Sequence, residues 1–217
     1  MITVIQVVKR ALEPMGHSRA EKAESRERIL DVTARQIRQG GLDSVSIAEI
    51  MKAANLTHGG FYGHFPSRAG LISAALERAL DRGEAAFYAN RSADETATVK
   101  SIVNSYLSPA HRDNTQEGCA IAALSGDVGR AEDDQVRAQM SRRLEQSFED
   151  MAGAMGGGPK AEAAAMTAWC AMVGAINLSR VFRGTPRADE ILRAARQSIL
   201  DLEATVRGGE VSTSAQR

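Results

Sequence analysis

Residues 46–68, SIAEIMKAANLTHGGFYGHFPSR, contain two short helical patterns separated by a turn signal. Ser46 and Glu49 fit the capping box S-x-x-E, so the first helix is predicted to begin at Ile47. Apolar residues then recur at three- and four-residue spacing, which gives this helix one apolar face. Asn55 follows where the chain must leave the helix, and asparagine tolerates the left-handed conformation that such an exit often needs.

The second helical pattern runs from His58 to Phe65 and is weak by propensity. Thr57 is predicted to cap it, and Pro66 limits it because the residue before a proline disfavours helical conformation. Its three glycines each cost roughly 0.8–1 kcal/mol relative to alanine. We therefore expect tertiary contacts to hold it. The apolar side chains available for those contacts are Leu56, Phe61 and Phe65.

The other face of this second helix is small and polar. Gly59 and Gly60 leave no side chain there, so the backbone can approach a partner closely. This layout is typical of a helix-turn-helix, whose second helix enters the major groove of DNA. The alternative is a glycine-rich packing corner. The residues expected to contact bases or phosphates are Ser46, Thr57, His58, Gly59, Gly60, Tyr62, His64 and Arg68.

Residues 24–82 resemble the DNA-binding domain of the TetR (tetracycline-repressor-like) family of bacterial transcriptional regulators. Residues 28–41 take the place of the family's first helix, RILDAALELFxxxG. Residues 46–68 follow its pattern T-x-x-x-I-A-x-x-A-G-V-S-x-G-x-L-Y-x-H-F-x-S-K. The resemblance implies an all-α protein that dimerises through its last two long helices and binds palindromic operators.

The chain departs from this family pattern in three places. Asn55 replaces the usual turn glycine, and His58 stands where lysine is common, which should alter operator preference. Arg35 and Gln36 interrupt the first helix where apolar residues often pack. The third departure bears on how that helix packs.

Charge is unevenly distributed along the 217 residues, which suffice for two small domains. Residues 1–82 hold 12 Lys and Arg against 9 Asp and Glu, and residues 83–217 hold 15 against 18. The positive excess lies in the part expected to meet phosphates. The expected organisation is an N-terminal arm (1–23), a helix-turn-helix domain (24–67), a helical ligand-binding and dimerisation domain (68–207) and a tail (208–217).

Cysteine content and hydropathy exclude several classes of protein. Two cysteines far apart in sequence disfavour a disulfide framework or a four-ligand zinc site, and we expect no metal or cofactor. Lys9 and Arg10 follow the apolar start instead of preceding it, which is the wrong order for a secretory signal. No stretch reaches about 18 uncharged apolar residues. We expect a cytoplasmic protein with no membrane partner, in which residues 1–20 are an arm, an extra DNA contact or a leader before Met15.

The remaining sequence is predicted to be helical, with residues 112–118 as a loop. Residues 160–183 are apolar or small on nearly every face, so this helix needs burial on more than one side. A two-fold partner supplying the same helix together with residues 188–206 would complete a four-helix interface. The alternative is a monomeric bundle with a thick core. The candidate interface residues are Trp169, Val173, Ile176, Ile191, Ala195, Ile199 and Leu202.

The resemblance also implies an inducer cavity between the linking helix and the dimer helices. The alternative for such methionine and aromatic positions is ordinary core. The candidate pocket residues are Tyr106, Cys119, Phe148, Met151, Met166 and Trp169.

The leading hypothesis is a non-enzymatic, homodimeric repressor that an unidentified small-molecule inducer releases from operator DNA. Such an inducer must bind the released geometry more tightly than the DNA-bound geometry, because equal affinity for the two does not shift the equilibrium between them. One alternative is a redox-sensing regulator whose signal is oxidation of Cys119, a thiol at a helix start. The other is an all-α thiol enzyme with Cys119 as nucleophile and His111 as base, for which no orienting third residue is evident.

Overall fold

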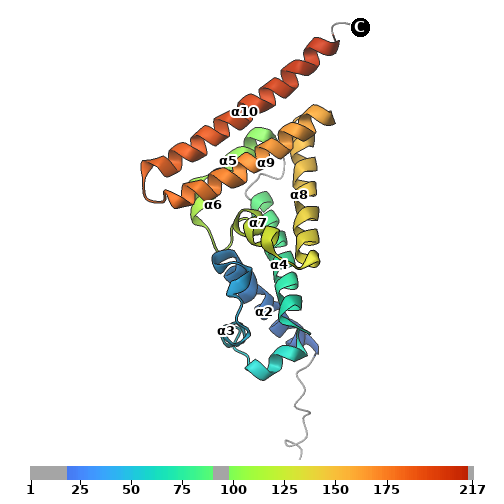
Figure 1. The fold of residues 1–217 in the computed structure, drawn as a ribbon, viewed down its shortest axis with the longest axis vertical. Helices are drawn as coiled ribbons and strands as arrows, with labels where there is room; N and C mark the ends of the chain where they lie inside the picture. The colour runs from blue at the N-terminus through green and yellow to red at the C-terminus, as the bar shows by residue number, and fades with distance from the viewer. Residues whose placement is uncertain (1–18, 90–97, 215–217) are drawn as a thin grey trace, which may run out of the picture.

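The protein is all-α over residues 19–89 and 98–214, the ranges that the computed structural model describes, and these ranges contain no strand. The N-terminal part comprises α2 (Arg19–Gly40), the 3₁₀ turn η1 (Leu42–Ser44), α3 (Ile47–Ala53) and the 3₁₀ helix η2 (His58–Gly63). We refer to these four elements as the reading domain. Helix α4 (Arg68–Ala89) packs along α2 and leads away from it (Figure 1).

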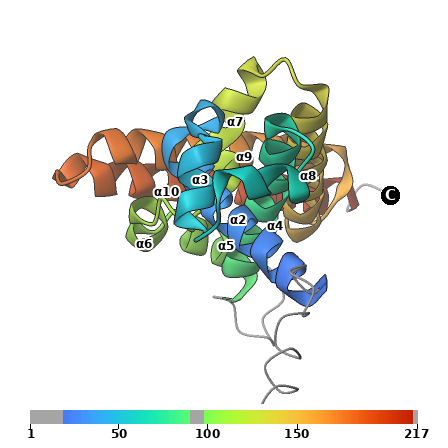
Figure 2. The same ribbon diagram turned by 90° about the horizontal axis from the view of Figure 1, so that it is seen from below.

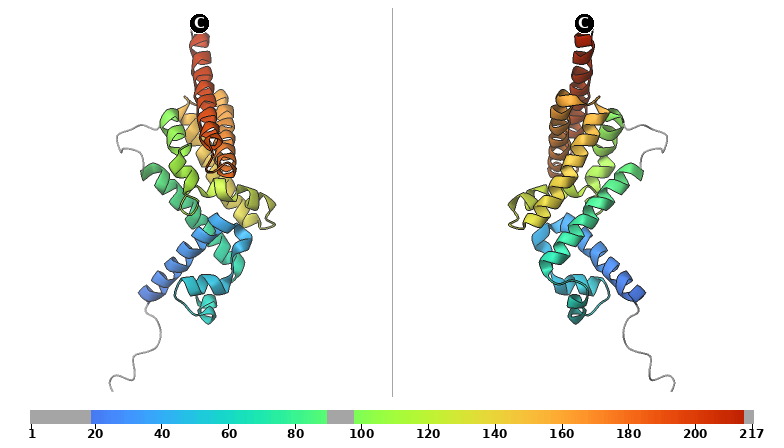
Figure 3. Two further views of the ribbon diagram at one scale, coloured as in Figure 1. Left: turned by 90° about the vertical axis from the view of Figure 1, so that its left-hand side faces the viewer. Right: turned by 90° about the vertical axis from the view of Figure 1, so that its right-hand side faces the viewer.

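The C-terminal part begins with α5 (Val99–Tyr106), α6 (Pro109–Asp113) and α7 (Ala120–Arg130). Three long helices follow, α8 (Asp134–Ala154), α9 (Gly158–Val181) and α10 (Pro186–Ser214). Helices α4 and α8 stand upright between the reading domain and the end formed by α9 and α10, which pack along each other (Figures 1 and 3). The reading domain therefore lies at the opposite end of the molecule from α10.

Several element boundaries differ from the sequence-based expectations. Helix α2 already begins at Arg19, so residues 19–23 of the expected arm are helical, and α10 continues through residues 208–214 of the expected tail. Helix α6 occupies part of a region expected to be loop, because the Ser108 hydroxyl caps it at the His111 amide and Pro109 is preorganised at its first turn. Residues 1–18, 90–97 and 215–217 lie outside the described residues.

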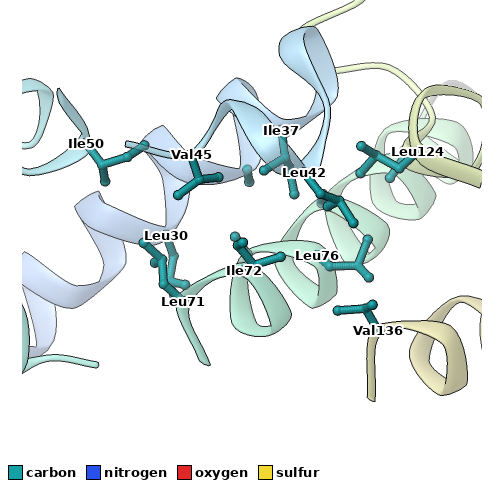
Figure 4. Packing of buried hydrophobic residues seen from close by; sticks show 14 of the residues in the cluster. Leu30, Ile37, Leu42, Val45, Ile50, Leu71, Ile72, Leu76, Leu124 and Val136 are labelled. Atoms are coloured by element: carbon teal, nitrogen blue, oxygen red, sulfur yellow. The ribbon is translucent and has the colours of Figure 1, made fainter. Parts of the chain in front are cut away.

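One apolar cluster runs from the reading domain into the C-terminal part. Figure 4 shows Leu30 of α2 beside Leu71 of α4, with Leu76 further along α4 and Leu124 of α7 and Val136 of α8 continuing the same cluster. Buried side chains of this kind each contribute about 1.5–3 kcal/mol relative to exposure. The boundary expected at residues 67 and 68 is therefore crossed by continuous packing.

A second cluster fills the space among α5, α8, α9 and α10. Helix α9 is long and apolar enough to cross a membrane, but core helices of soluble proteins pass the same test, and 39% of its most apolar window is buried here. Its buried side consists largely of alanines, which allow close approach of α10. This packing uses part of the surface that the sequence assigned to a partner.

Two candidate dimer residues need correction for this reason. Ile176 and Ile199 are completely or almost completely buried within the single chain, where α9 and α10 pack against each other. Trp169, Val173 and the candidates on α10 at positions 191, 195 and 202 are half-buried against the same core. The exposed large apolar side chains of α9 lie on another side of the helix and comprise Met166, Leu178 and Val181, with exposed Phe182 following at the C-cap.

Candidate nucleic-acid interface

The turn between α3 and η2 has the geometry that the sequence predicts. The Ser46 hydroxyl accepts from the Glu49 amide at 3.5 Å, and α3 begins at Ile47. Asn55 has φ 59°, and it is the one non-glycine residue with positive φ among the described residues. The Leu56 amide then donates to the Met51 carbonyl at 2.8 Å, which closes the end of α3. The predicted helix start and left-handed exit are both confirmed.

The second helix of the motif is a 3₁₀ helix of two turns instead of an α-helix. The Gly60 amide donates to the Thr57 carbonyl at 3.0 Å, and the His64 amide donates to the Phe61 carbonyl at 2.9 Å. Thr57 occupies the cap position, but its hydroxyl makes no capping hydrogen bond, so that prediction was wrong. Since 3₁₀ turns are used in short pieces and the glycines disfavour an α-helix, the tighter helix fits this segment.

Tertiary packing holds η2 from behind, as its poor propensity requires. Phe61 and Phe65 are 0% and 2% exposed, and their rings stack with centroids 6.0 Å apart. Leu56 is half-buried against the same apolar cluster. The Arg26 guanidinium of α2 lies 4.6 Å above the Phe65 ring centroid, within the range of a cation–π contact. The inner face of η2 is therefore anchored to both α3 and α2.

The outer face of η2 is open. Thr57, His58 and Gly59 are exposed, and the Tyr62 side chain is 70% exposed. A Cβ atom added to Gly59 would meet no atom within 4 Å, whereas one at Gly60 would be in ordinary contact with Thr57. Figure 2 views the molecule from the end at which α3 and this face lie. The backbone of η2 is therefore directly accessible to a large partner.

The remaining candidates differ in their surroundings. Ser46 and His64 are half-buried. Arg68 is exposed as a residue, yet its Nε donates to the Val45 carbonyl at 2.9 Å and its Nη2 to the carbonyls of Leu42 and Asp43 at 3.2 Å. Arg68 therefore braces the turn that leads into α3. Its contact with phosphate stays a prediction.

Comparison with known proteins gives this arrangement a family. Residues 29–75 match the family model of bacterial regulatory proteins of the tetR family. The match to the TetR family thus covers most of the reading domain and the start of α4. Over 60 residues the chain is 42% identical to the HTH-type transcriptional regulator AcrR of Shigella flexneri, a match that covers 28% of the length of each protein.

Solved structures, including those of TetR-family regulators, share the fold over most of this chain. The regulator from Cytophaga hutchinsonii superimposes with a TM-score of 0.70 at 19% sequence identity, covering 88% of this chain and 97% of that one. Escherichia coli NemR in its reduced form gives a TM-score of 0.65 at 19% identity, covering 81% and 95%. The common architecture thus includes the C-terminal helices.

The pocket candidates, all of which lie within the described residues, do not gather around one cavity. Tyr106 is 2% exposed, and its ring centroid lies 5.3 Å from that of Trp169, whose indole N–H donates to the Ser147 carbonyl. Met151 is buried and Phe148 is half-buried. Met166 is 47% exposed on the outer side of α9, so its assignment to an interior pocket was wrong.

The surroundings of His111 disfavour a thiol enzyme. His111 Nε2 accepts from the backbone amide of Cys119 at 3.2 Å, and Nδ1 lies 2.6 Å from the Tyr106 carbonyl oxygen. Burial lowers the pKa of His111, which favours the neutral ring that this pair of bonds requires. Because the acceptor nitrogen serves an amide, it is not placed as a base for the Cys119 thiol. A redox role for Cys119 stays a prediction.

The structure also explains the third departure from the family pattern, which is the pair Arg35 and Gln36 in the first helix. Gln36 Nε2 donates to the Ser44 carbonyl at 2.6 Å, and Arg35 lies 3.6 Å from the Glu117 carboxylate. Both side chains therefore leave the core and bind neighbouring turns. The basic residue that does enter the interior is Arg38, whose side chain is completely buried. Its burial could not be predicted from the sequence, since nothing in its spacing separates it from an exposed arginine.

Proposed function

We propose that the protein is a homodimeric transcriptional repressor that binds operator DNA through α3 and η2 and is released by a small-molecule inducer. The observation that carries this proposal is the open outer face of η2, braced from behind by Phe61 and Phe65. Thr57 and His58 are assigned to base edges. Ser46, Tyr62, His64 and Arg68 are assigned to the phosphate backbone, which positions the protein without reading sequence.

Dimerisation is supported by the exposed apolar stripe on α9. Leu178 and Val181 are 57% and 77% exposed, and they lie on α9, the apolar helix that packs along α10. Exposed apolar patches of this kind mark interaction sites. A second copy related by a two-fold axis would cover the stripe with the same stripe, and it would pair two reading domains for a palindromic operator.

The inducer is assigned to the aromatic centre of the C-terminal part, around Tyr106, Met151 and Trp169. These side chains are closely packed in the described residues, so inducer binding requires that the centre open. The opened state must also bind the inducer more tightly than the closed state does. The proposal includes a cytoplasmic location, where such a regulator would meet operator DNA.

Selection of bound DNA from a random duplex pool tests this proposal. We expect a two-fold symmetric consensus, with the full-length protein eluting as a dimer before and after DNA binding. Tyr62→Ala should lower affinity for the selected duplex at least tenfold while leaving the dimer intact. Recovery of no enriched sequence, or equal affinity of Tyr62→Ala at matched salt, would refute the assignment.

A further inference from the structure

A buried arginine joins the reading domain to the rest of the chain. Arg38 lies in the last turn of α2, and its Nε donates to the Gln116 carbonyl at 2.5 Å. Its Nη1 donates to the Ala79 carbonyl of α4 at 3.3 Å, and its Nη2 lies 3.1 Å from the Glu117 carboxylate. A buried guanidinium depends on such partners, because breaking a buried pair leaves an uncompensated charge.

Two of these partners lie in residues 114–119, between α6 and α7, which we call the joining segment. It is held in one conformation by its own contacts. The Asn114 side-chain oxygen accepts from the Glu117 amide at 3.1 Å. A Cβ atom at Gly118 would clash with the Asn114 carbonyl oxygen, so the turn closes tightly on itself. A shift of this segment therefore displaces both groups that it offers to Arg38.

The other end of the joining segment is attached to the aromatic centre. The Cys119 amide donates to His111, which in turn contacts the Tyr106 carbonyl oxygen and packs edge-on to the Tyr106 ring at 4.5 Å between centroids. Tyr106 packs in the same way on Trp169. One short segment thus touches the buried centre of the C-terminal part on one side and α2 on the other.

We infer that Arg38 is a coupling residue, which transmits rearrangement of the Tyr106, His111 and Cys119 cluster to the orientation of α2. Since α2 supports α3 and η2, its orientation sets where the outer face of η2 points. When the joining segment moves, α2 must follow or the Arg38 bonds must break. The inference rests on the proposed function, because its readout is DNA affinity.

A double-mutant cycle of Arg38→Met and His111→Leu tests the inference. The measurement is the dissociation constant of the full-length protein for the duplex selected from the random pool. Circular dichroism first establishes the folded fraction, so that each constant refers to folded protein. We expect His111→Leu to change the constant at least tenfold in the parent and less than twofold in Arg38→Met. Equal changes in both backgrounds would overturn the inference.

Glu117→Gln provides a second route if Arg38→Met does not fold, because it keeps the side-chain shape and removes the charge. It should reduce the effect of His111→Leu about threefold or more. Arg196→Met is the matched control. Arg196 lies on α10 and donates to the Leu107 carbonyl at 2.7 Å, so its contact stays within the C-terminal part. In that background the His111→Leu effect should persist.

A purely structural role for Arg38 has a different outcome. Arg38→Met would then lower the melting temperature while the DNA affinity of the folded protein, and its response to His111→Leu, stayed as in the parent. That result overturns the inference but leaves the proposed function standing. If the parent protein enriches no DNA sequence, the proposed function fails and the inference fails with it.

Discussion

The imidazole of His111 accepts a hydrogen bond from the backbone amide of Cys119 at 3.2 Å, so this ring must be neutral for the contact to exist. Its other nitrogen lies 2.6 Å from the Tyr106 carbonyl oxygen, where only an N–H group is compatible. The two contacts together fix the ring in one tautomer. They connect the end of α5 to the start of α7 through a single side chain.

Acid should weaken the fold through this contact. Burial lowers the pKa of His111 in the folded state, whereas in the unfolded chain it is about 6.5. Below about pH 6.5 the unfolded state therefore binds more protons than the folded state. As the pH is lowered from there to the folded pKa, the free energy of unfolding falls by at most about 1.4 kcal/mol per pH unit. Urea unfolding at pH 7.5 and 5.5 measures the loss. His111→Gln should show a smaller difference between the two pH values, and an equal difference would contradict the assignment.

Asn55→Ala and Asn55→Gly should have opposite effects on stability. The left-handed conformation at φ 59° costs an alanine roughly 1–2 kcal/mol, while glycine adopts it freely. We therefore expect a lower melting temperature for Asn55→Ala and an unchanged or higher one for Asn55→Gly. Thermal unfolding followed by circular dichroism makes the comparison. Similar melting temperatures for the two variants would show that the turn does not require this conformation.

Phe61 and Tyr62 are neighbours in sequence with opposite roles. Phe61→Ala removes a fully buried ring and should lower the free energy of unfolding by about 3–5 kcal/mol. Tyr62→Ala removes an exposed ring and should change it by no more than about 0.5 kcal/mol. Urea titration of both variants checks this pair of values. Comparable losses would mean that Tyr62 is part of the core.

Gly59→Ala should separate folding from DNA binding. The new methyl group meets no atom of the chain within 4 Å, so stability should be unchanged or slightly higher. The same methyl group projects from the face assigned to the DNA groove, and affinity for the selected duplex should fall about fivefold or more. A shift assay at constant salt measures it. Undiminished affinity would indicate that η2 does not approach DNA at this position.

Leu178→Glu should disrupt the dimer and spare the protomer. The Leu178 side chain is 57% exposed, so its replacement removes little buried area within one chain and leaves the free energy of unfolding of the protomer nearly unchanged. Across a two-fold interface the change places like charges close together, which opposes association. Sedimentation velocity over a range of concentrations should show a weaker dimer. A control at Arg193, exposed on α10, should leave the association constant unchanged when replaced by lysine.

Local sequence determined the frame of the reading domain. The start of α3 at Ile47 follows from Ser46, and the left-handed turn follows from Asn55, because caps and backbone preferences depend on residues only a few positions apart. The burial of Phe61 and Phe65 was also predictable, since a glycine-rich helix requires apolar support. These features are encoded within 20 residues, a stretch that also carries part of the family resemblance.

Tertiary structure decided what depends on distant partners. Arg38 is buried because groups 78 and 79 residues further along the chain satisfy its guanidinium, and no local pattern contains that information. Ile176 faces inward and Met166 faces outward because α9 is apolar on nearly every side, so only the packing of α8 and α10 chooses its buried face. Hydrophobic periodicity selects a face when one exists, and on a helix without a polar side the choice belongs to its neighbours.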